Sequence, residues 1–157
     1  STRLTGDGRV LYVSPPSRLI VRQADTGTLV KEIHLPCGVG EFSLSADEKL
    51  LAFFDSTKNL NILSVETGEC IRKIESPMDA HTLPVWSPDD SLFAGEKHLG
   101  NENYAVAIFD ARDGNVLDEF RLEQGVETSQ LEFHPTEKKQ LICGFDSGEC
   151  AVLEFDI

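Results

Sequence analysis

One phrase recurs four times in this chain of 157 residues, and the recurrence constrains the fold more than any other feature. The copies read FSLSADEKLLAFF (42–54), VWSPDDSLFAGE (85–96), LEFHPTEKKQLICG (131–144) and, in diverged form, TRLTGDGRVLYV from Thr2. The equivalent positions Asp7, Asp47, Asp89 and Thr136 are 40, 42 and 47 residues apart. Periods of about 40 to 50 residues are typical of propellers and helical solenoids.

A second phrase recurs out of step with the first, and its local pattern excludes helices. It reads ADTGTLVKEI (24–33), VETGECIRKI (65–74) and ARDGNVLDEF (111–120), in each case a polar pair, a Gly and an alternating apolar run. Short β-rich runs alternate with turn signals such as SPDDS and ETG about every 8 to 12 residues. No segment sustains an apolar helical face. Each repeat is therefore predicted to hold up to four antiparallel strands, labelled a to d from inner to outer.

The repeats predict four blades, with boundaries near 1–38, 39–78, 79–125 and 126–157. Expected strands a to d are 2–5, 10–14, 18–24 and 28–35 in the first blade, and 40–45, 50–55, 60–66 and 69–76 in the second. The third has 82–87, 92–97, 104–111 and 116–123. The fourth has 127–134, 140–145 and 150–156, with strand d missing.

These phrases resemble the WD40 family of β-propellers. FSLSADEKLLAF and WSPDDSLFAG are similar to the a–b hairpin of that family, and Phe109-Asp110 and Phe155-Asp156 stand at its Trp-Asp position. The chain departs from the family pattern at Arg22-Gln23 and Leu63-Ser64, and the Gly-His before strand a is absent, so the buried His–Asp network is not carried over. The resemblance implies an all-β propeller segment of about 3.75 blades, part or half of a larger ring, acting as a non-catalytic interaction scaffold.

Terminal blades of a propeller expose apolar faces unless something covers them. Three explanations stay open. The chain is a piece of a longer propeller, or two copies form a homodimer that completes a ring of about eight blades, or another chain donates the missing strand. We rank the first highest.

The charge is acidic, with 14 basic against 27 acidic residues, a net of −13. This argues against nucleic acid, whose binding needs Lys and Arg, and against anionic membranes. It favours a protein or peptide partner that is neutral or basic. Residues 101–134 carry eight acids and two Arg, which is either a solvated face or a docking patch for a basic partner. No signal or membrane segment stands out, so we expect a cytoplasmic protein.

Site residues are expected on the face shared by the d–a and b–c loops, because the a–b and c–d turns are tight. The d–a loops are 34–40, 76–82 and 122–128, and the longest b–c loop is EKHLGNENY, 96–104. The candidate partner-binding residues are Cys37, Met78, Asp79, His81, Lys97, His98 and Asn101. Simple solvation is the commoner explanation of Glu96, Lys97 and His98 in the long loop, and packing or a hydrogen bond at a blade entrance is the commoner explanation of His81.

No catalytic constellation emerges, and we expect no enzyme activity, metal or cofactor. The four Cys lack zinc spacing and are expected to be reduced thiols, with Cys143 buried. No H-x-H, H-E-x-x-H or G-x-S-x-G occurs. The alternative is a ligand-binding or metal-dependent hydrolytic propeller in which His34, His81 and His98 approach one face. Trp86 is expected to fill the core between blades, and His134 to be structural.

Overall fold

The computed structural model describes residues 2–15, 17–36, 38–39, 42–55, 57, 59–75, 83–137 and 139–157. All regular elements in these ranges are β-strands, grouped in four antiparallel sheets. Among the described residues there is no helix of the length and apolarity needed to cross a membrane. Contacts divide the chain into two compact units, Ser1–Lys73 (unit 1) and Ile74–Ile157 (unit 2), with the boundary inside the last strand of the second sheet.

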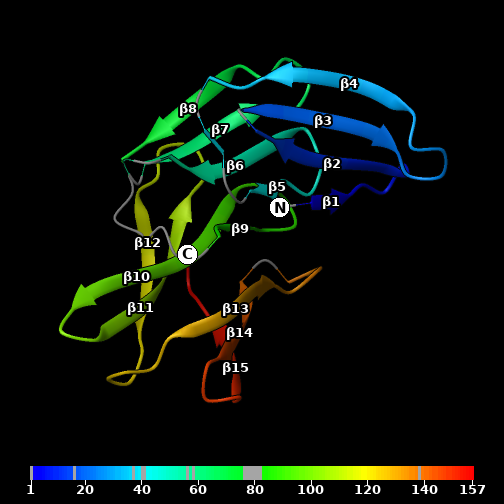
Figure 1. Cartoon of the computed structure of the whole chain (residues 1–157). Helices are drawn as coiled ribbons and strands as arrows, with labels where there is room; N and C mark the ends of the chain where they lie inside the picture. The colour runs from blue at the N-terminus through cyan, green and yellow to red at the C-terminus, as the bar shows by residue number, and fades with distance from the viewer. Residues whose placement is uncertain are drawn as a thin grey trace. The chain divides into compact units, whose positions relative to one another are not determined.

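Unit 1 is built on two four-stranded sheets in which the strands follow chain order (Figure 1). The first contains β1 (Thr2–Leu4), β2 (Arg9–Ser14), β3 (Arg18–Gln23) and β4 (Leu29–His34). The second contains β5 (Ser43–Leu44), β6 (Leu50–Phe54), β7 (Leu60–Ser64) and β8 (Cys70–Ile74). One core joins the two sheets: Leu11, Leu19 and Val21 of the first are buried with Phe42, Phe53 and Leu63 of the second.

Unit 2 repeats this arrangement with one strand fewer. Its first sheet contains β9 (Val85–Trp86), β10 (Leu92–Gly100), β11 (Asn103–Asp110) and β12 (Val116–Arg121). The second contains β13 (Thr128–Phe133), β14 (Gln140–Phe145) and β15 (Cys150–Glu154) and has three strands within the described chain, as predicted. Its core packs Val106 and Ile108 against Leu131, Leu141 and Cys143.

The recurrent a–b phrase forms the same turn in three sheets, and in the first of them Thr5 Oγ1 donates to Asp7 Oδ1 at 2.5 Å and accepts from the Arg9 N–H. Ser45 Oγ donates to Asp47 Oδ1 at 2.8 Å, and Ser87 Oγ donates to Asp89 Oδ1 at the same distance. Each hydroxyl also accepts a backbone N–H, from Leu50 and from Leu92. In the fourth copy His134 takes the place of the Ser, and its Nδ1 lies 3.1 Å from the N–H of Glu137. His134 therefore has the structural role that was predicted.

The c–d phrase closes each outer hairpin with a glycine at positive φ. Gly27 and Gly68 occupy equivalent turns at φ 70° and 75°. Gly68 also lies against the neighbouring sheet, since a Cβ there would stand 2.1 Å from Ile33 Cγ2, whereas nothing lies within 4 Å of one at Gly27. The second glycine is thus required by packing as well as by backbone conformation.

The sequence makes a prediction about the burial of two side chains in unit 2, Cys143 and Trp86. Cys143 is fully buried, as expected. Trp86 is half-buried and meets Phe93 edge-on at 6.3 Å, and Phe93 stacks on Phe109 at 5.2 Å. The indole therefore packs in an aromatic row across its own sheet.

Candidate functional site

The longest b–c connection is a strand hairpin, and the prediction of a loop over 96–104 is wrong. β10 continues to Gly100 and β11 begins at Asn103, so that Lys97 pairs with Ala105 and His98 with Tyr104. The chain reverses through Asn101 and Glu102, at φ 52° and 58°. Two successive positive φ angles are typical of the type I′ turn, whose twist matches that of its strands.

The hairpin is fastened to the connection that follows β12. The Leu122 N–H donates to the Tyr104 carbonyl at 2.9 Å, and the Gly125 N–H donates to the Glu102 carbonyl at the same distance. The b–c hairpin and the d–a connection of this sheet therefore share one face, as predicted. Backbone bonds of this kind present the side chains between them on a fixed frame.

The base of the hairpin is held by a buried carboxylate. Glu96 is 3% exposed, and its Oε2 accepts from the Thr128 N–H at 2.6 Å and from the Thr128 hydroxyl at 2.7 Å. These charge-assisted bonds join β10 to the first residue of β13, in the neighbouring sheet of unit 2. The two bonds between Glu96 and Thr128 therefore fix the base of the hairpin against β13.

A hollow of about 430 Å³ lies where the hairpin meets β12. Its lining combines apolar and polar side chains, namely Leu99, Asn103, Tyr104, Arg121 and Leu122. Leu99 stays 37% exposed although it is a large apolar residue. A concave surface with an apolar lining and a few polar groups suits one side chain of a partner.

The structure brings three of the seven predicted site residues together on this hairpin. Lys97 is engaged, because its Nζ pairs with Glu119 Oε2 at 2.7 Å and both side chains are three-quarters buried. The His98 ring packs against Tyr104 at 4.9 Å. Asn101 forms the turn, and its carbonyl accepts from the Asn103 side chain. The other four, Cys37, Met78, Asp79 and His81, lie outside the described residues.

The residues that line the hollow escaped sequence reasoning. The sequence predicts a polar loop around Leu99, and it predicts Tyr104 both as the end of that loop and as the first residue of the next strand. Arg121 and Leu122 come from β12 and the connection after it, about twenty residues further along the chain. One local signal was present: Leu99 is a single large apolar residue between His98 and Gly100.

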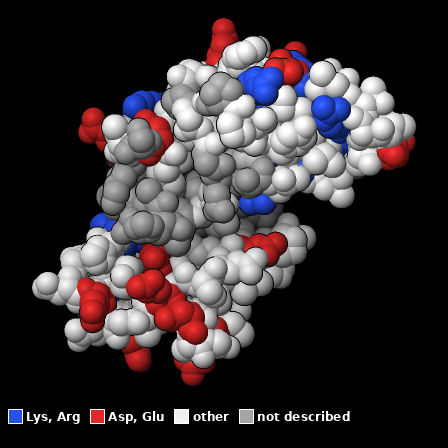
Figure 2. Space-filling model, in the orientation of Figure 1, with Lys and Arg blue, Asp and Glu red and all other residues white. Residues whose placement is uncertain are grey.

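Charge is distributed unequally between the two units. Residues 1–73 hold nine acidic and nine basic residues, whereas residues 74–157 hold 18 acidic and five basic ones, so the whole net charge of −13 belongs to unit 2. Figure 2 shows acidic side chains gathered over the part of unit 2 that carries the hairpin and the start of β13. Such asymmetry favours a basic partner for unit 2.

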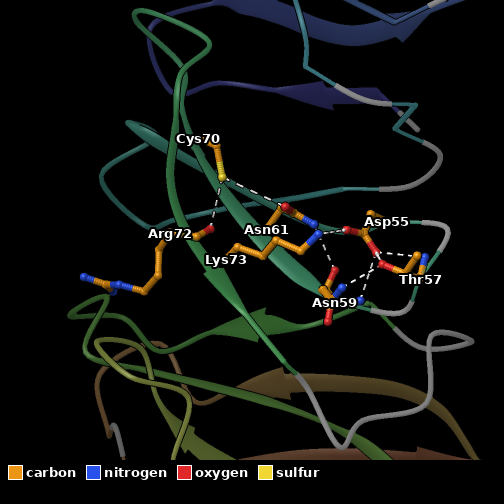
Figure 3. A network of polar contacts seen from close by, with 7 residues as sticks. All are labelled: Asp55, Thr57, Asn59, Asn61, Cys70, Arg72 and Lys73. Carbon is orange, nitrogen blue, oxygen red and sulfur yellow. Dashed lines mark hydrogen bonds and ion pairs between the residues drawn. The ribbon is translucent and has the colours of Figure 1, made fainter.

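A polar network in unit 1 contains the most strongly shifted carboxyl group among the described residues (Figure 3). Asp55 Oδ1 accepts from the N–H groups of Thr57 and Asn59 at 2.9 and 3.0 Å, and Oδ2 pairs with Lys73 Nζ at 2.8 Å. Burial raises the pKa of Asp55, but hydrogen bonds from Lys73, Thr57 and Asn61 outweigh it and hold the pKa well below its ordinary value. A carboxylate with both oxygens occupied is a structural group, here the clamp between the β6–β7 turn and β8.

The described residues offer no cluster of three or more His, Cys, Asp or Glu that could hold a metal ion. His34 lies at the end of β4 in unit 1 and His98 on β10 in unit 2. Cys70, Cys143 and Cys150 are free thiols, and burial raises the pKa of Cys143 to about 11. That thiol is therefore a poor nucleophile at neutral pH.

No protein-family model and no curated protein matches this sequence. Solved structures do match. One is the C-terminal WD40 domain of Sif2, at a TM-score of 0.69 and 16% identity over 99% of this chain. This likeness, together with the four sheets described above, decides the fold. The fold is that of a WD40-like β-propeller. The WD40-like segment also resembles the hydrazine synthase of Kuenenia stuttgartiensis, at a TM-score of 0.65 and 18% identity over 92% of the present chain.

The chain spans about two-fifths of the length of these solved structures, 42% in both comparisons. At such identities the likeness concerns the fold alone. Each sheet of this WD40-like segment is one blade, so the hairpin site belongs to the third blade, β9–β12.

Proposed function

We propose that this WD40-like segment is a non-catalytic protein-interaction scaffold whose contact surface is the β10–β11 hairpin with its hollow. The observation that carries the proposal is Leu99, a large apolar side chain that is 37% exposed at the edge of a 430 Å³ hollow on a backbone-fastened hairpin. Propeller folds generally support interaction scaffolds, and function has to be argued from the site. A protein or peptide side chain would occupy the hollow.

Rigidity supports this assignment. The hairpin is tied by backbone bonds at Leu122 and Gly125 and by the Glu96–Thr128 bonds at its base. A site held in one conformation loses less conformational entropy when a partner binds. Exposed free thiols at Cys70 and Cys150 suit a reducing compartment, which supports a cytoplasmic location as part of the proposal.

Site-specific photocrosslinking tests the proposal. A photoreactive amino acid replaces Leu99 in one sample and Leu117 in another, since Leu117 is 42% exposed on β12 of the same blade. In an extract of the parent cells, position 99 is expected to give a discrete adduct that position 117 does not give. Equal adducts at both positions, or none at position 99, would count against the hairpin as the contact surface.

A second candidate is an assembly module, favoured by β15. This strand pairs with β14 and has no partner on its other edge among the described residues, and Val152 on it is 59% exposed. Such an edge accepts a further strand or a second copy. Light scattering at tens of micromolar decides whether copies associate, because a strict monomer excludes a homodimeric ring.

A different assay distinguishes the scaffold from the alternative of a ligand-binding or hydrolytic propeller. The likeness to hydrazine synthase concerns the fold and assigns no chemistry to this chain. Metal analysis of the purified protein with a thermal-shift screen tests this class. If the protein binds a metal ion tightly at one per chain, and if substitution of His34 or His98 abolishes that binding, the hydrolytic alternative would take the place of the scaffold proposal.

A further inference from the structure

The apolar hollow and the charge around it together specify the chemistry of the partner. We infer that the hairpin docks a basic peptide segment that places one apolar side chain in the hollow between Leu99, Tyr104 and Leu122. The inference rests on the proposed function and deepens it by naming the class of ligand.

The apolar part of the inference follows from the lining. Leu99 and Leu122 come from β10 and from the connection after β12, and Tyr104 lies between them on β11. The bond between the Leu122 N–H and the Tyr104 carbonyl fastens the backbone that carries two of these side chains. Covering Leu99 would remove its 37% exposed surface from water, which favours an aliphatic or aromatic side chain.

The basic part follows from carboxylates around the hairpin that form no ion pair with any described residue. Glu102, Glu123 and Glu127 are exposed and form no ion pair within the described part of the chain. The backbones of Glu102 and Glu123 lie close to the hairpin tip, since the Gly125 N–H bonds to Glu102 and the Val126 N–H bonds to Glu123. Glu127 precedes Thr128, whose N–H bonds to Glu96 at the base of the hairpin. Of the two cations nearby, Lys97 is committed to Glu119. Arg121 remains 80% exposed, 3.8 Å from the same carboxylate.

Among the described residues, the surroundings of the hairpin from its tip at Glu102 to its base beside Glu127 therefore offer three negative charges to one exposed cation. Lys or Arg residues flanking an apolar anchor would meet these carboxylates, whereas an acidic segment would be repelled both here and by the net charge of −13 in unit 2. Exposed pairs of this kind are weak individually and screened by salt. Affinity should come from the anchor, and discrimination between partners from these carboxylates.

A peptide array provides the probe. Peptides of about twelve residues carry a central Leu, Phe or Met, and the flanking residues vary in charge from acidic through neutral to basic. Fluorescence polarisation with the whole chain is expected to show binding by the basic members, weakening as salt rises. A neutral or acidic series that binds as well, through Leu99, overturns the inference on charge and leaves the hairpin as contact surface.

Two pairs of variants locate the binding. Leu99→Ser is expected to weaken the basic peptides by about tenfold or more, and the matched control Leu117→Ser to leave them unchanged. Glu123→Gln with Glu127→Gln should weaken them several-fold and flatten the salt dependence. The control is Glu132→Gln with Glu137→Gln, which changes the net charge equally elsewhere in unit 2.

Each outcome is decisive for the inference. If both control variants weaken binding as much as the site variants, the attraction is diffuse and the inference fails. If no peptide of any charge binds in a Leu99-dependent manner, the inference fails as well. In that case the crosslinking at position 99 still decides independently whether the hairpin is a contact surface. Circular dichroism of each variant confirms that it is folded.

Discussion

Replacement of Gly68 by Ala probes how the two blades of unit 1 pack, and Gly27→Ala is its control. The two glycines occupy the same turn in successive blades at nearly equal φ, 75° and 70°. They differ in surroundings: a Cβ at position 68 would lie 2.1 Å from Ile33 Cγ2 and 3.6 Å from the His34 carbonyl oxygen. At position 27 nothing lies within 4 Å.

The expected cost has two parts. Positive φ costs a residue with a Cβ about 1–2 kcal/mol at either position. Only Gly68→Ala also overpacks the junction, and Ile33 yields poorly because it is β-branched and 7% exposed. Overpacking typically costs about 1–3 kcal/mol. Gly68→Ala should therefore lower the free energy of unfolding by about 1–3 kcal/mol more than Gly27→Ala does.

Urea unfolding followed by circular dichroism measures this difference. Fluorescence is less suitable, since the single Trp, Trp86, lies in unit 2. In a double-mutant cycle, Ile33→Ala should relieve the clash, so that Gly68→Ala costs less in that background than in the wild type. Equal destabilisation by the two glycine variants, without coupling to Ile33, would refute the reasoning that Gly68 packs against the first blade.

Three further outcomes are expected. Asp55→Asn removes the ion pair with Lys73 and should cost about 1–3 kcal/mol. The pKa of Asp55 is lower in the folded protein than in the unfolded chain, so its carboxylate contributes its full stabilisation above the unfolded pKa of about 3.9. That stabilisation is lost progressively as the pH falls below about 3.9. Between pH 5 and pH 2, urea titrations should therefore show a smaller loss of stability for Asp55→Asn than for the wild type. Glu96→Gln keeps one acceptor for Thr128 but loses the charge, and hydrogen exchange at the Thr128 amide should speed up several-fold without global unfolding. Cys143, with its pKa raised to about 11, should be the last described thiol to react with iodoacetamide in peptide mapping; early labelling there would contradict its burial.

The strands could be predicted from the sequence because turn chemistry brackets each one. Ser45 with Asp47, and Ser87 with Asp89, mark hairpins by residues that bond their own backbone, and the structure contains these bonds. The predicted strand 140–145 and the observed β14 coincide for the same reason, since it lies between two such turns.

The site could be predicted only in its location. EKHLGNENY has the polarity of a loop, but in the structure it is part of a hairpin. Lys97 of β10 pairs with Ala105 of β11, and Ala105 in turn pairs with Arg121 of β12. Glu96 looked solvated because its partner, Thr128, lies 32 residues further along the chain. A hollow formed by three strands has no period or motif, so Leu99, Arg121 and Leu122 carried no joint signal.

Hydrogen–deuterium exchange of the whole chain, with and without the tightest basic peptide of the array, tests the central claim most directly. Protection is expected to appear at Leu99–Tyr104 and Arg121–Glu127 and to be absent when Leu99 is replaced by Ser. Protection confined to the a–b and c–d turns on the opposite loop face, around Asp89 and Gly114, would contradict it.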